Sequence, residues 1–329
     1  MMLRRTGLKG SLALAGWAIG ASRSGQAAEP PDFNEFIVRA VREVVALRQG
    51  GGYDIRRAFT QDLSYGPSGT VPSSQPPIRV PGPNPTMCVA AVSEVIIEAI
   101  NLYVASGAEN GLPAEKSVYS MLPVRSWRSG NLRSIKSHIF MFQEADSQGT
   151  ADALETFGIG KMRDFPSLKP GDFVNFNRTR TGHAVVFMGF LNAARQEVPF
   201  SKDVVGFRYF SAQGQGRPDG GMGYRNGWFA GKCPSPRTSQ DDCDIRAAYE
   251  VGADGSVRQN QSLLNCGRMY HPSVWRTAEA QEALRAKTRG IYQSEAQTRG
   301  IDPDTYAEQK LDDELQAVPE RYQDGSVEE

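Results

Sequence analysis

Apolar residues recur at helical spacing in residues 32–47, where they mark one face of a helix. Asp32 is the expected N-cap, and Glu35 stands three residues later, where a capping box places its acidic partner. Three consecutive glycines at 50–52 end the pattern. The segment is therefore predicted to be an amphipathic helix that packs its apolar face on a core.

A second helical pattern follows the proline-rich segment 64–85, which is predicted to be extended and irregular. This pattern runs over residues 86–105, and its apolar positions cover a broad surface, as in helices buried between other elements. Thr86 is the expected N-cap, so Cys88 is expected in the first turn. Free N–H groups and the positive end of the helix dipole favour a thiolate there.

Further along, helical patterns give way to strand patterns. Residues 112–145 are predicted to be mostly helical, and 150–157 to form a short helix that Gly158 ends. Segments rich in valine, phenylalanine and tyrosine predict strands at 173–176, 183–191 and 204–213. The glycine-rich segment 214–235 is predicted to be a long loop.

The first 28 residues have the composition of an export signal and are not expected to join the fold. Arg4 and Arg5 precede a short apolar run, and small residues at 25–28 offer a cleavage site. The twin arginine resembles the signal that exports folded proteins, which predicts a periplasmic or secreted location in a bacterium. No stable membrane span is expected after cleavage, with an uncleaved anchor as the alternative.

The patterns divide the chain into four parts: the signal 1–28, an N-terminal helix and extended segment 29–85, a main domain 86–272 and a tail 273–329. The tail is charged and poor in large apolar residues, so it is predicted to be helical or partly disordered. It is a candidate surface for an unknown protein partner. The formal net charge of the chain is zero, so nothing favours a nucleic-acid partner.

The chain has four cysteines: Cys88, Cys233, Cys243 and Cys266. In an oxidising compartment, four cysteines are typical of two disulfides. Three of them, however, lie in the stretch 230–267, whereas Cys88 stands apart. The expected arrangement is one disulfide within this group, with a third cysteine there and Cys88 outside it. A disulfide that includes Cys88 is the alternative.

His183 opens the most apolar of the predicted strands, where a rigid element would hold its ring. Together with Cys88 it suggests a cysteine nucleophile with a histidine base. The next strand ends in Ser211 and Gln213, which share one face because strand side chains alternate. Gln213 has the longer reach and is the expected orienter of the imidazole, with Ser211 as the alternative.

Each of these residues also has a purely structural interpretation. Cys88 fits a small buried core residue, His183 a structural histidine, and the two polar residues an ordinary strand end.

The order of these elements resembles that of the NlpC-type and CHAP superfamily of papain-like cysteine amidases and peptidases. Residues 169–174, Lys-Pro-Gly-Asp-Phe-Val, are similar to the family's strand start, and residues 182–186, Gly-His-Ala-Val-Val, to its histidine strand. Ser211 and Gln213 fall where members carry a third polar residue. The resemblance covers about residues 80–215.

The chain departs from this family at three points. Met87 stands where many members have Asp or Gln, and the third position is not an acid. The interval between Cys88 and His183 is long for compact members, which implies extra helices.

The resemblance implies an α+β, papain-like fold in which a nucleophile-bearing helix packs on a small antiparallel sheet, with extra helices and a helical C-terminal tail. It also implies an exported cysteine hydrolase that cleaves amide bonds through a thioester. Export suggests peptidoglycan stem peptides, or another peptide, as the substrate. Tyr224 and Trp228, in the predicted glycine-rich loop, are candidate walls of the substrate cleft.

Two other functions fit the same residues. One is a non-catalytic exported binding or scaffold protein, and the other is an acyltransferase that uses the same Cys-His pair. No cofactor or metal is expected, because the His, Cys and Asp residues lack ligand spacing. Asp241, Asp242 and Asp244 are expected to form an exposed acidic loop rather than a cation site.

Overall fold

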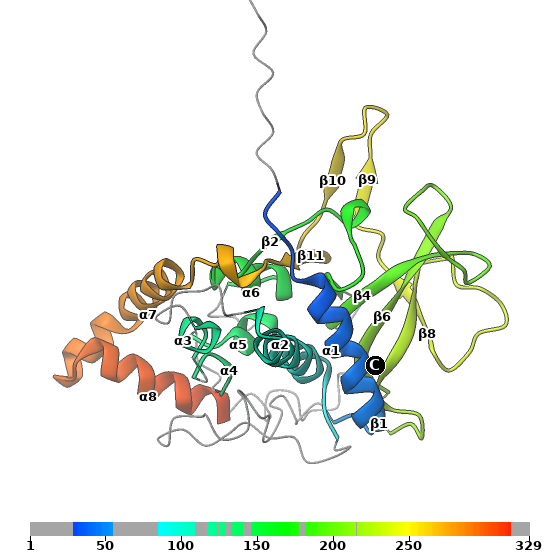
Figure 1. Cartoon of the computed structure of the whole chain (residues 1–329). Helices are drawn as coiled ribbons and strands as arrows, with labels where there is room; N and C mark the ends of the chain where they lie inside the picture. The colour runs from blue at the N-terminus through cyan, green and yellow to red at the C-terminus, as the bar shows by residue number, and fades with distance from the viewer. Residues whose placement is uncertain are drawn as a thin grey trace, which may run out of the picture.

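The computed structural model describes residues 29–54, 85–108, 117–123, 125–128, 133–140, 146–177, 182–214 and 216–316. The predictions for the export signal, for most of the proline-rich segment and for the end of the tail lie outside these ranges, as do parts of the 112–145 segment. Within them, the chain is an α+β protein whose helices gather on one side of a mostly antiparallel sheet (Figure 1).

The helices are α1 (Asn34–Arg48), α2 (Cys88–Ala105), α3 (Val118–Met121), α4 (Arg125–Arg128), α5 (Ile135–Ile139), α6 (Thr150–Thr156), α7 (Thr277–Arg299) and α8 (Pro303–Gln316). The strands are β1 (Gly50–Gly51), β2 (Gly160–Met162), β3 (Phe173–Asn177), β4 (Gly182–Asn192), β5 (Glu197–Val198), β6 (Val204–Gln213), β7 (Gly221–Phe229), β8 (Asp241–Ile245), β9 (Tyr249–Val251), β10 (Val257–Gln259) and β11 (Leu264–Met269). The three predicted strands are confirmed as β3, β4 and β6, and three predicted helices as α1, α2 and α6.

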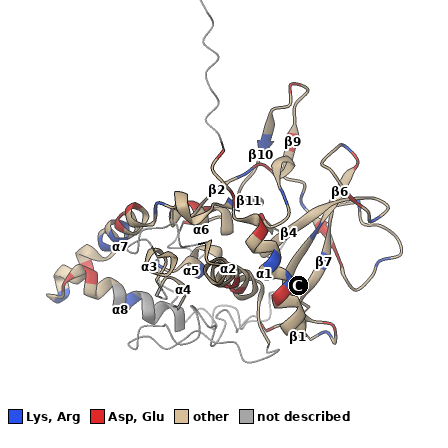
Figure 2. Ribbon diagram, in the orientation of Figure 1, with Lys and Arg blue, Asp and Glu red and all other residues tan. Residues whose placement is uncertain are grey.

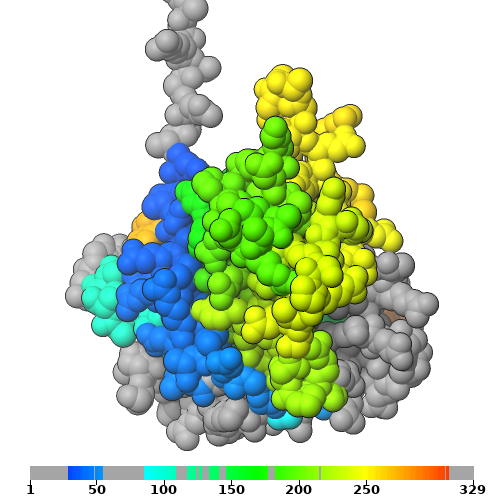
Figure 3. Space-filling view, turned by 90° about the vertical axis from the view of Figure 1, so that its right-hand side faces the viewer, coloured from blue at the N-terminus to red at the C-terminus, as the bar shows by residue number. Residues whose placement is uncertain are grey.

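The main sheet has the strand order β1-β7-β6-β4-β3-β11-β2, with β5 added to β4 and β8 added to β7. Neighbouring strands in this sheet are antiparallel, except β7 and β8, which are parallel. β9 and β10 form a separate hairpin that projects from the body (Figure 1). From the side, α1 in blue lies along the green and yellow surface of the sheet strands and their loops (Figure 3).

The two faces of the sheet are packed differently, because successive side chains of a strand point to opposite sides. The helix face, covered by α1, α2, α5 and α6, carries Phe173, Ala184, Val186, Phe210 and Ala212. The aromatic face, on the other side, carries Val174, Phe176, Val185, Phe187, Phe207 and Tyr209. Full burial of each phenylalanine stabilises the fold by about 1.5–3 kcal/mol, so both faces contribute to the core.

α2 is mostly apolar and is buried over most of its length. It packs against α1 and against β4 and β6 of the helix face. Every residue from Cys88 to Ile97 is buried. Among the described residues, α2 is the one helix long and apolar enough to cross a membrane, but most of it lies inside the protein. Its composition is thus explained by its place in the core.

The predicted capping box of α1 is wrong. The helix begins at Asn34, so Phe33 occupies the N-cap and Asp32 lies outside it. Asp32 instead pairs with Tyr270 in an isolated antiparallel bridge, and its side chain accepts a hydrogen bond from the Asn34 N–H at 3.3 Å. Pairing with a distant segment, rather than a local cap, therefore sets where this helix starts.

The predicted N-cap of α2 is displaced in the same way. Met87 occupies the N-cap, and its side chain makes no capping hydrogen bond. Thr86 lies one residue earlier and forms a parallel bridge with Tyr53. The chain is therefore held in an extended conformation up to Met87, and Cys88 becomes the first helical residue.

The prediction of a long loop over 214–235 is also wrong, because the segment contains β7, which pairs with β6 from Gly221 to Trp228. The sheet is too crowded here for larger residues. A Cβ at Gly221 would meet the backbone carbonyl of Gly50, and a Cβ at Gly227 would lie 2.5 Å from Cδ1 of Ile245. These glycines mark close approach within a strand rather than a loop.

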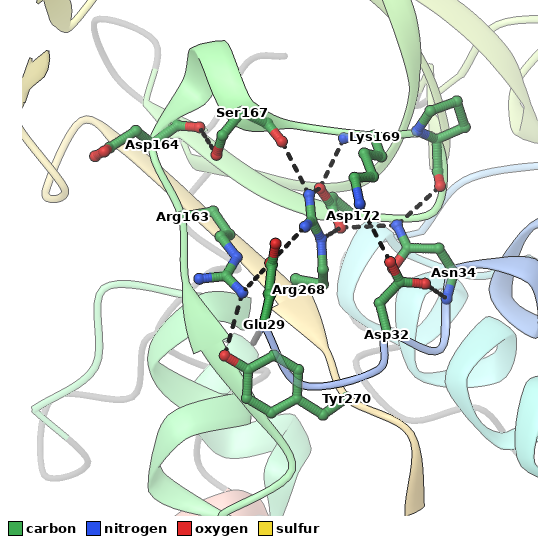
Figure 4. A network of polar contacts seen from close by, with 11 residues as sticks. Glu29, Asp32, Asn34, Arg163, Asp164, Ser167, Lys169, Asp172, Arg268 and Tyr270 are labelled. Atoms are coloured by element: carbon green, nitrogen blue, oxygen red, sulfur yellow. Dashed lines mark hydrogen bonds and ion pairs between the residues drawn. The ribbon is translucent and has the colours of Figure 1, made fainter. Parts of the chain in front are cut away.

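Asp172, just before β3, is the centre of a buried polar network (Figure 4). Its carboxylate accepts two 2.8 Å hydrogen bonds from Arg268, one from the Asn34 amide and one from the Lys169 backbone. Arg268 also donates to Glu29 at 2.9 Å. Because Asp172 and Arg268 are buried, this network ties the start of the described chain to β3 and β11. Asp172 has the structural role expected of its turn.

The cysteines are arranged as expected, with one disulfide between Cys233 and Cys243. Cys88 and Cys266 are buried thiols. The disulfide bridges the loop that joins β7 to β8 and fixes the start of β8. A disulfide of this kind fits an oxidising, exported environment.

The tail is helical as far as it is described. α7 and α8 form a helical hairpin, and α7 ends at Gly300, whose φ of 65° suits a residue without a side chain. The hairpin is held by a small cluster made of Tyr292, Ala296, Tyr306 and Ala307. α7 carries both acidic and basic residues (Figure 2).

Candidate functional site

Cys88 lies in the first turn of α2, as predicted. Its side chain belongs to the core on the helix face and is 5% exposed. The first turn of α2 has no acidic residue, so the field of the helix start is not cancelled there. The arrangement is a buried thiol at the positive end of a long helix, in which the helix start favours the thiolate and burial opposes it.

His183 lies near the start of β4, with its ring on the aromatic face. The residue pairs with Phe176 of β3. The centroid of its ring lies 5.4 Å from that of Phe176 and 5.9 Å from that of Tyr209. Since α2 covers the other side of the sheet, the structure does not bring the imidazole and the Cys88 thiol onto one face.

The two groups nevertheless lie at the same end of the sheet. Thr86, just before α2, donates its N–H to the Gly52 carbonyl, and the Gly52 N–H donates to the Gly220 carbonyl, just before β7. Gln213 ends β6 beside the start of β7. Because β4 runs antiparallel to β6, His183 near the start of β4 is also at this end.

Gln213 and His183 share a neighbour, Tyr209. The Tyr209 hydroxyl lies 2.6 Å from Oε1 of Gln213 and 3.1 Å from Oδ2 of Asp242, while its ring contacts the His183 ring. The structure therefore gathers the expected base and the expected orienter on the aromatic face.

Ser211, the alternative orienter, is used elsewhere. Its hydroxyl donates a 2.7 Å hydrogen bond to the backbone carbonyl of Ala184, and its side chain is fully buried. The bond ties β6 to β4 just beyond their last paired residues, Val186 and Phe210. This leaves Gln213 as the better candidate for the third position.

The aromatic residues assigned to a substrate cleft behave differently from one another. Trp228 is fully buried, its indole N–H donates to Asp241 at 2.8 Å, and Arg195 stacks on its ring. It is therefore a packing residue, contrary to the prediction. Tyr224 is partly exposed, with the Arg208 guanidinium 5.1 Å from its ring centroid, so it stays a candidate for contact with a substrate.

The Asp241 side chain is fully buried and pairs with Arg195, so it is not part of an exposed acidic loop. Burial opposes ionisation of its carboxyl, but hydrogen bonds from Arg195, Thr238 and Trp228 outweigh this and hold the pKa of Asp241 well below its usual value. Asp244 is exposed, as expected. Among the described residues, no group of three or more His, Cys, Asp or Glu side chains could hold a metal ion.

Cys266 is a core residue of β11 on the aromatic face. Burial strongly raises the pKa of its thiol, so it stays protonated and unreactive at neutral pH. Cys88 is the thiol with the helix-start setting.

Sequence reasoning missed Tyr209 and Asp242. Tyr209, Ser211 and Gln213 are alternate residues of one strand, so their side chains face the same side. The sequence alone could therefore have indicated Tyr209. Asp242 reaches Tyr209 through the parallel pairing of β8 with β7, which no local pattern predicts.

Comparison with known proteins assigns no family: no protein-family model matches the sequence, and no curated protein or solved structure matches it significantly.

Proposed function

We propose that the protein is an exported cysteine hydrolase that cleaves amide bonds, with Cys88 as nucleophile and His183 as base. The observation that carries this proposal is the placement of Cys88 in the first turn of α2, which packs on the two strands that carry His183 and Gln213. The resemblance of segments 169–174 and 182–186 to papain-like amidases supports the same assignment.

In the proposed reaction, His183 takes the proton of Cys88, and the thiolate attacks the amide carbonyl. The N–H groups at the start of α2 stabilise the developing oxyanion. The protonated imidazole then gives its proton to the leaving amine, and water releases the acyl group from the thioester. Gln213 orients the ring.

This reaction requires a rearrangement of His183. The ring packs against Phe176 and Tyr209 on the aromatic face, whereas Cys88 lies on the helix face. Because both groups lie at one end of the sheet, rotation of the His183 side chain off the Phe176 ring, toward the strand end, would let them meet around that end. Gln213, the last residue of β6, is placed to hold the ring there.

The proposed substrate is a peptide amide bond in peptidoglycan. The support is the compartment: the N-terminal sequence has the composition of a twin-arginine signal, and the chain carries a disulfide. We propose the periplasm or the extracellular space as the place of action.

The test is turnover of purified peptidoglycan, followed by the release of free amines. Cys88→Ala is expected to lower turnover by a factor of about 10³ or more while the unfolding midpoint stays close to that of the unchanged protein. Cys266→Ala is the matched control, because it removes the other thiol and is expected to retain turnover. Turnover retained in Cys88→Ala would refute the proposal.

A second candidate function is a non-catalytic exported binding or scaffold protein. The observation that favours it is the burial of both groups on opposite faces of the sheet, since Cys88 is 5% and His183 2% exposed. In this case Cys88 reacts with iodoacetamide only after unfolding. Peptidoglycan binding that is equal in Cys88→Ala and the unchanged protein, without turnover in either, would establish it.

A further inference from the structure

Tyr209 occupies a central position among the polar groups at the Gln213 end of the sheet. Its hydroxyl lies between Oε1 of Gln213 at 2.6 Å and Oδ2 of Asp242 at 3.1 Å. Its ring forms an edge contact with the His183 ring. One residue thus touches the expected orienter, the expected base and a carboxyl group that the proposed reaction does not use.

A phenol carries one proton, so the Tyr209 hydroxyl can donate to just one of its two neighbours. With Asp242 as a carboxylate, both contacts are satisfied when Tyr209 donates to Asp242 and accepts from the Gln213 amide. The two ends of an amide side chain have nearly the same shape, so Gln213 meets this condition by presenting Nε2 to the hydroxyl. Its carbonyl oxygen then points away from Tyr209.

The strand register puts that carbonyl on the same face of the sheet as His183. β4 and β6 pair up to Val186 and Phe210, and the bond from Ser211 to the Ala184 carbonyl keeps them together beyond that point. Continued in the same register, the two strands place His183 and Gln213 opposite each other. Opposite residues of an antiparallel pair have side chains on the same face.

We propose that Asp242 and Tyr209 are positioning residues of the site. The Asp242 carboxylate orients the Tyr209 hydroxyl, the hydroxyl fixes the Gln213 amide, and the Gln213 carbonyl accepts the N–H of His183 once the ring has turned toward the strand end. This inference rests on the proposed function for its catalytic meaning, but the hydrogen-bonded chain itself is a physical claim that can be tested without turnover.

The fold holds Asp242 in place by means unrelated to local sequence. β8 pairs in parallel with β7, and Asp242 stands opposite Gly227. A Cβ at Gly227 would lie 3.3 Å from the Tyr209 ring and 2.5 Å from Ile245. The absence of a side chain at Gly227 therefore lets Tyr209 and Ile245 pack against β7. The disulfide partner Cys243 follows Asp242 directly and anchors it.

The test is an NMR titration of the His183 ring in the purified protein with its disulfide intact, with the signals of the three histidines assigned by single replacements. Tyr209→Phe keeps the ring and removes the hydroxyl, and Asp242→Asn removes the charge. Each is expected to lower the pKa of His183 by about half a unit or more, because a carbonyl acceptor and a nearby carboxylate both favour the charged imidazole.

Two matched controls separate this effect from general disturbance. Tyr249→Phe changes another tyrosine of the aromatic cluster, which stacks on Phe165 at 4.8 Å. Asp244→Asn changes an exposed acid on the same strand, at a φ of 72° that asparagine tolerates. Both are expected to leave the His183 titration unchanged. If Tyr209→Phe and Asp242→Asn also leave it unchanged, the chain of hydrogen bonds does not exist.

Kinetics provide a second readout. In the proposed hydrolase, Tyr209→Phe is expected to lower kcat about tenfold with little change in KM, because it disturbs orientation of the base rather than substrate binding. An unchanged kcat alongside a shifted His183 titration would refute the positioning role. Absence of turnover in the unchanged protein would instead refute the proposed function, and the titration would still report on the hydrogen-bonded chain.

Discussion

The two ends of β3 carry polar groups of opposite character. At its start, Asp172 and Arg268 form a buried ion pair in which the carboxylate accepts hydrogen bonds from three different residues. At its other end, Phe176 packs against His183, near an amide, a phenol and a carboxyl group joined by short contacts. At the first end, the buried charges are paired with each other and stabilise the fold. The second end holds groups that can exchange protons, which is where chemistry is expected.

The largest expected effect is a loss of stability at the Asp172 end of β3. Asp172→Asn removes the buried counter-charge of the Arg268 guanidinium and leaves it only the half-exposed Glu29, so it is expected to lower the free energy of unfolding by about 3–5 kcal/mol. Urea denaturation measures this. The control is Glu250→Gln, which breaks the exposed pair with Arg258 and should cost no more than about 1 kcal/mol. Equal effects of the two changes would mean that the Asp172 end does not hold the fold.

A smaller effect is expected at the functional end. Gly227→Ala places a methyl group against Ile245 and the Tyr209 ring and should lower the free energy of unfolding by about 1–3 kcal/mol. Gly290→Ala in α7, where a Cβ meets nothing within 4 Å, should instead raise it by about 0.5–1 kcal/mol. Thermal unfolding shows whether each variant is less or more stable than the unchanged protein. If Gly227→Ala leaves the free energy of unfolding unchanged, the packing of the Tyr209 ring does not depend on the absence of a side chain at Gly227.

The smallest effect concerns pH. The pKa of Asp241 is held below its usual value in the folded protein, so its stabilising contribution is present above its unfolded pKa near 4 and is lost as the pH falls below that. Between pH 6 and pH 3, Asp241→Asn should therefore lose about 1–2 kcal/mol less stability than the unchanged protein. Identical losses would show that Arg195, Thr238 and Trp228 do not stabilise the charged form.

Local patterns predicted the elements whose residues have a strong preference of their own. The valine- and phenylalanine-rich segments became β3, β4 and β6, and the broad apolar surface after Cys88 became the buried α2. The glycines of β7 look like a loop in the sequence, so this strand was missed. They are needed because Gly50 and Ile245 leave no room for side chains, and these neighbours come close only in the assembled sheet. The helix starts at Asp32 and Thr86 were misplaced because bridges to distant residues override local caps.

The candidate site shows the same limit. Alternation predicts that Ser211 and Gln213 face one side, but it cannot say which side a helix covers. The position of His183 on the aromatic face follows from the pairing of β4 with β3 and from the packing of α2 on the other side. The burial of Trp228 and the role of Asp242 likewise depend on β8, whose parallel pairing has no local signal.

The central claim, that His183 activates Cys88, is tested most directly by the pH dependence of Cys88 alkylation in the folded protein, measured by peptide mass spectrometry. Cys266, whose thiol pKa is raised by burial, serves as the internal unreactive reference. A Cys-His pair predicts alkylation of Cys88 at pH 6 within a few-fold of its rate at pH 9, and loss of this low-pH reactivity in His183→Ala. A rate that rises about tenfold per pH unit in both proteins, or no reaction before unfolding, would contradict the account.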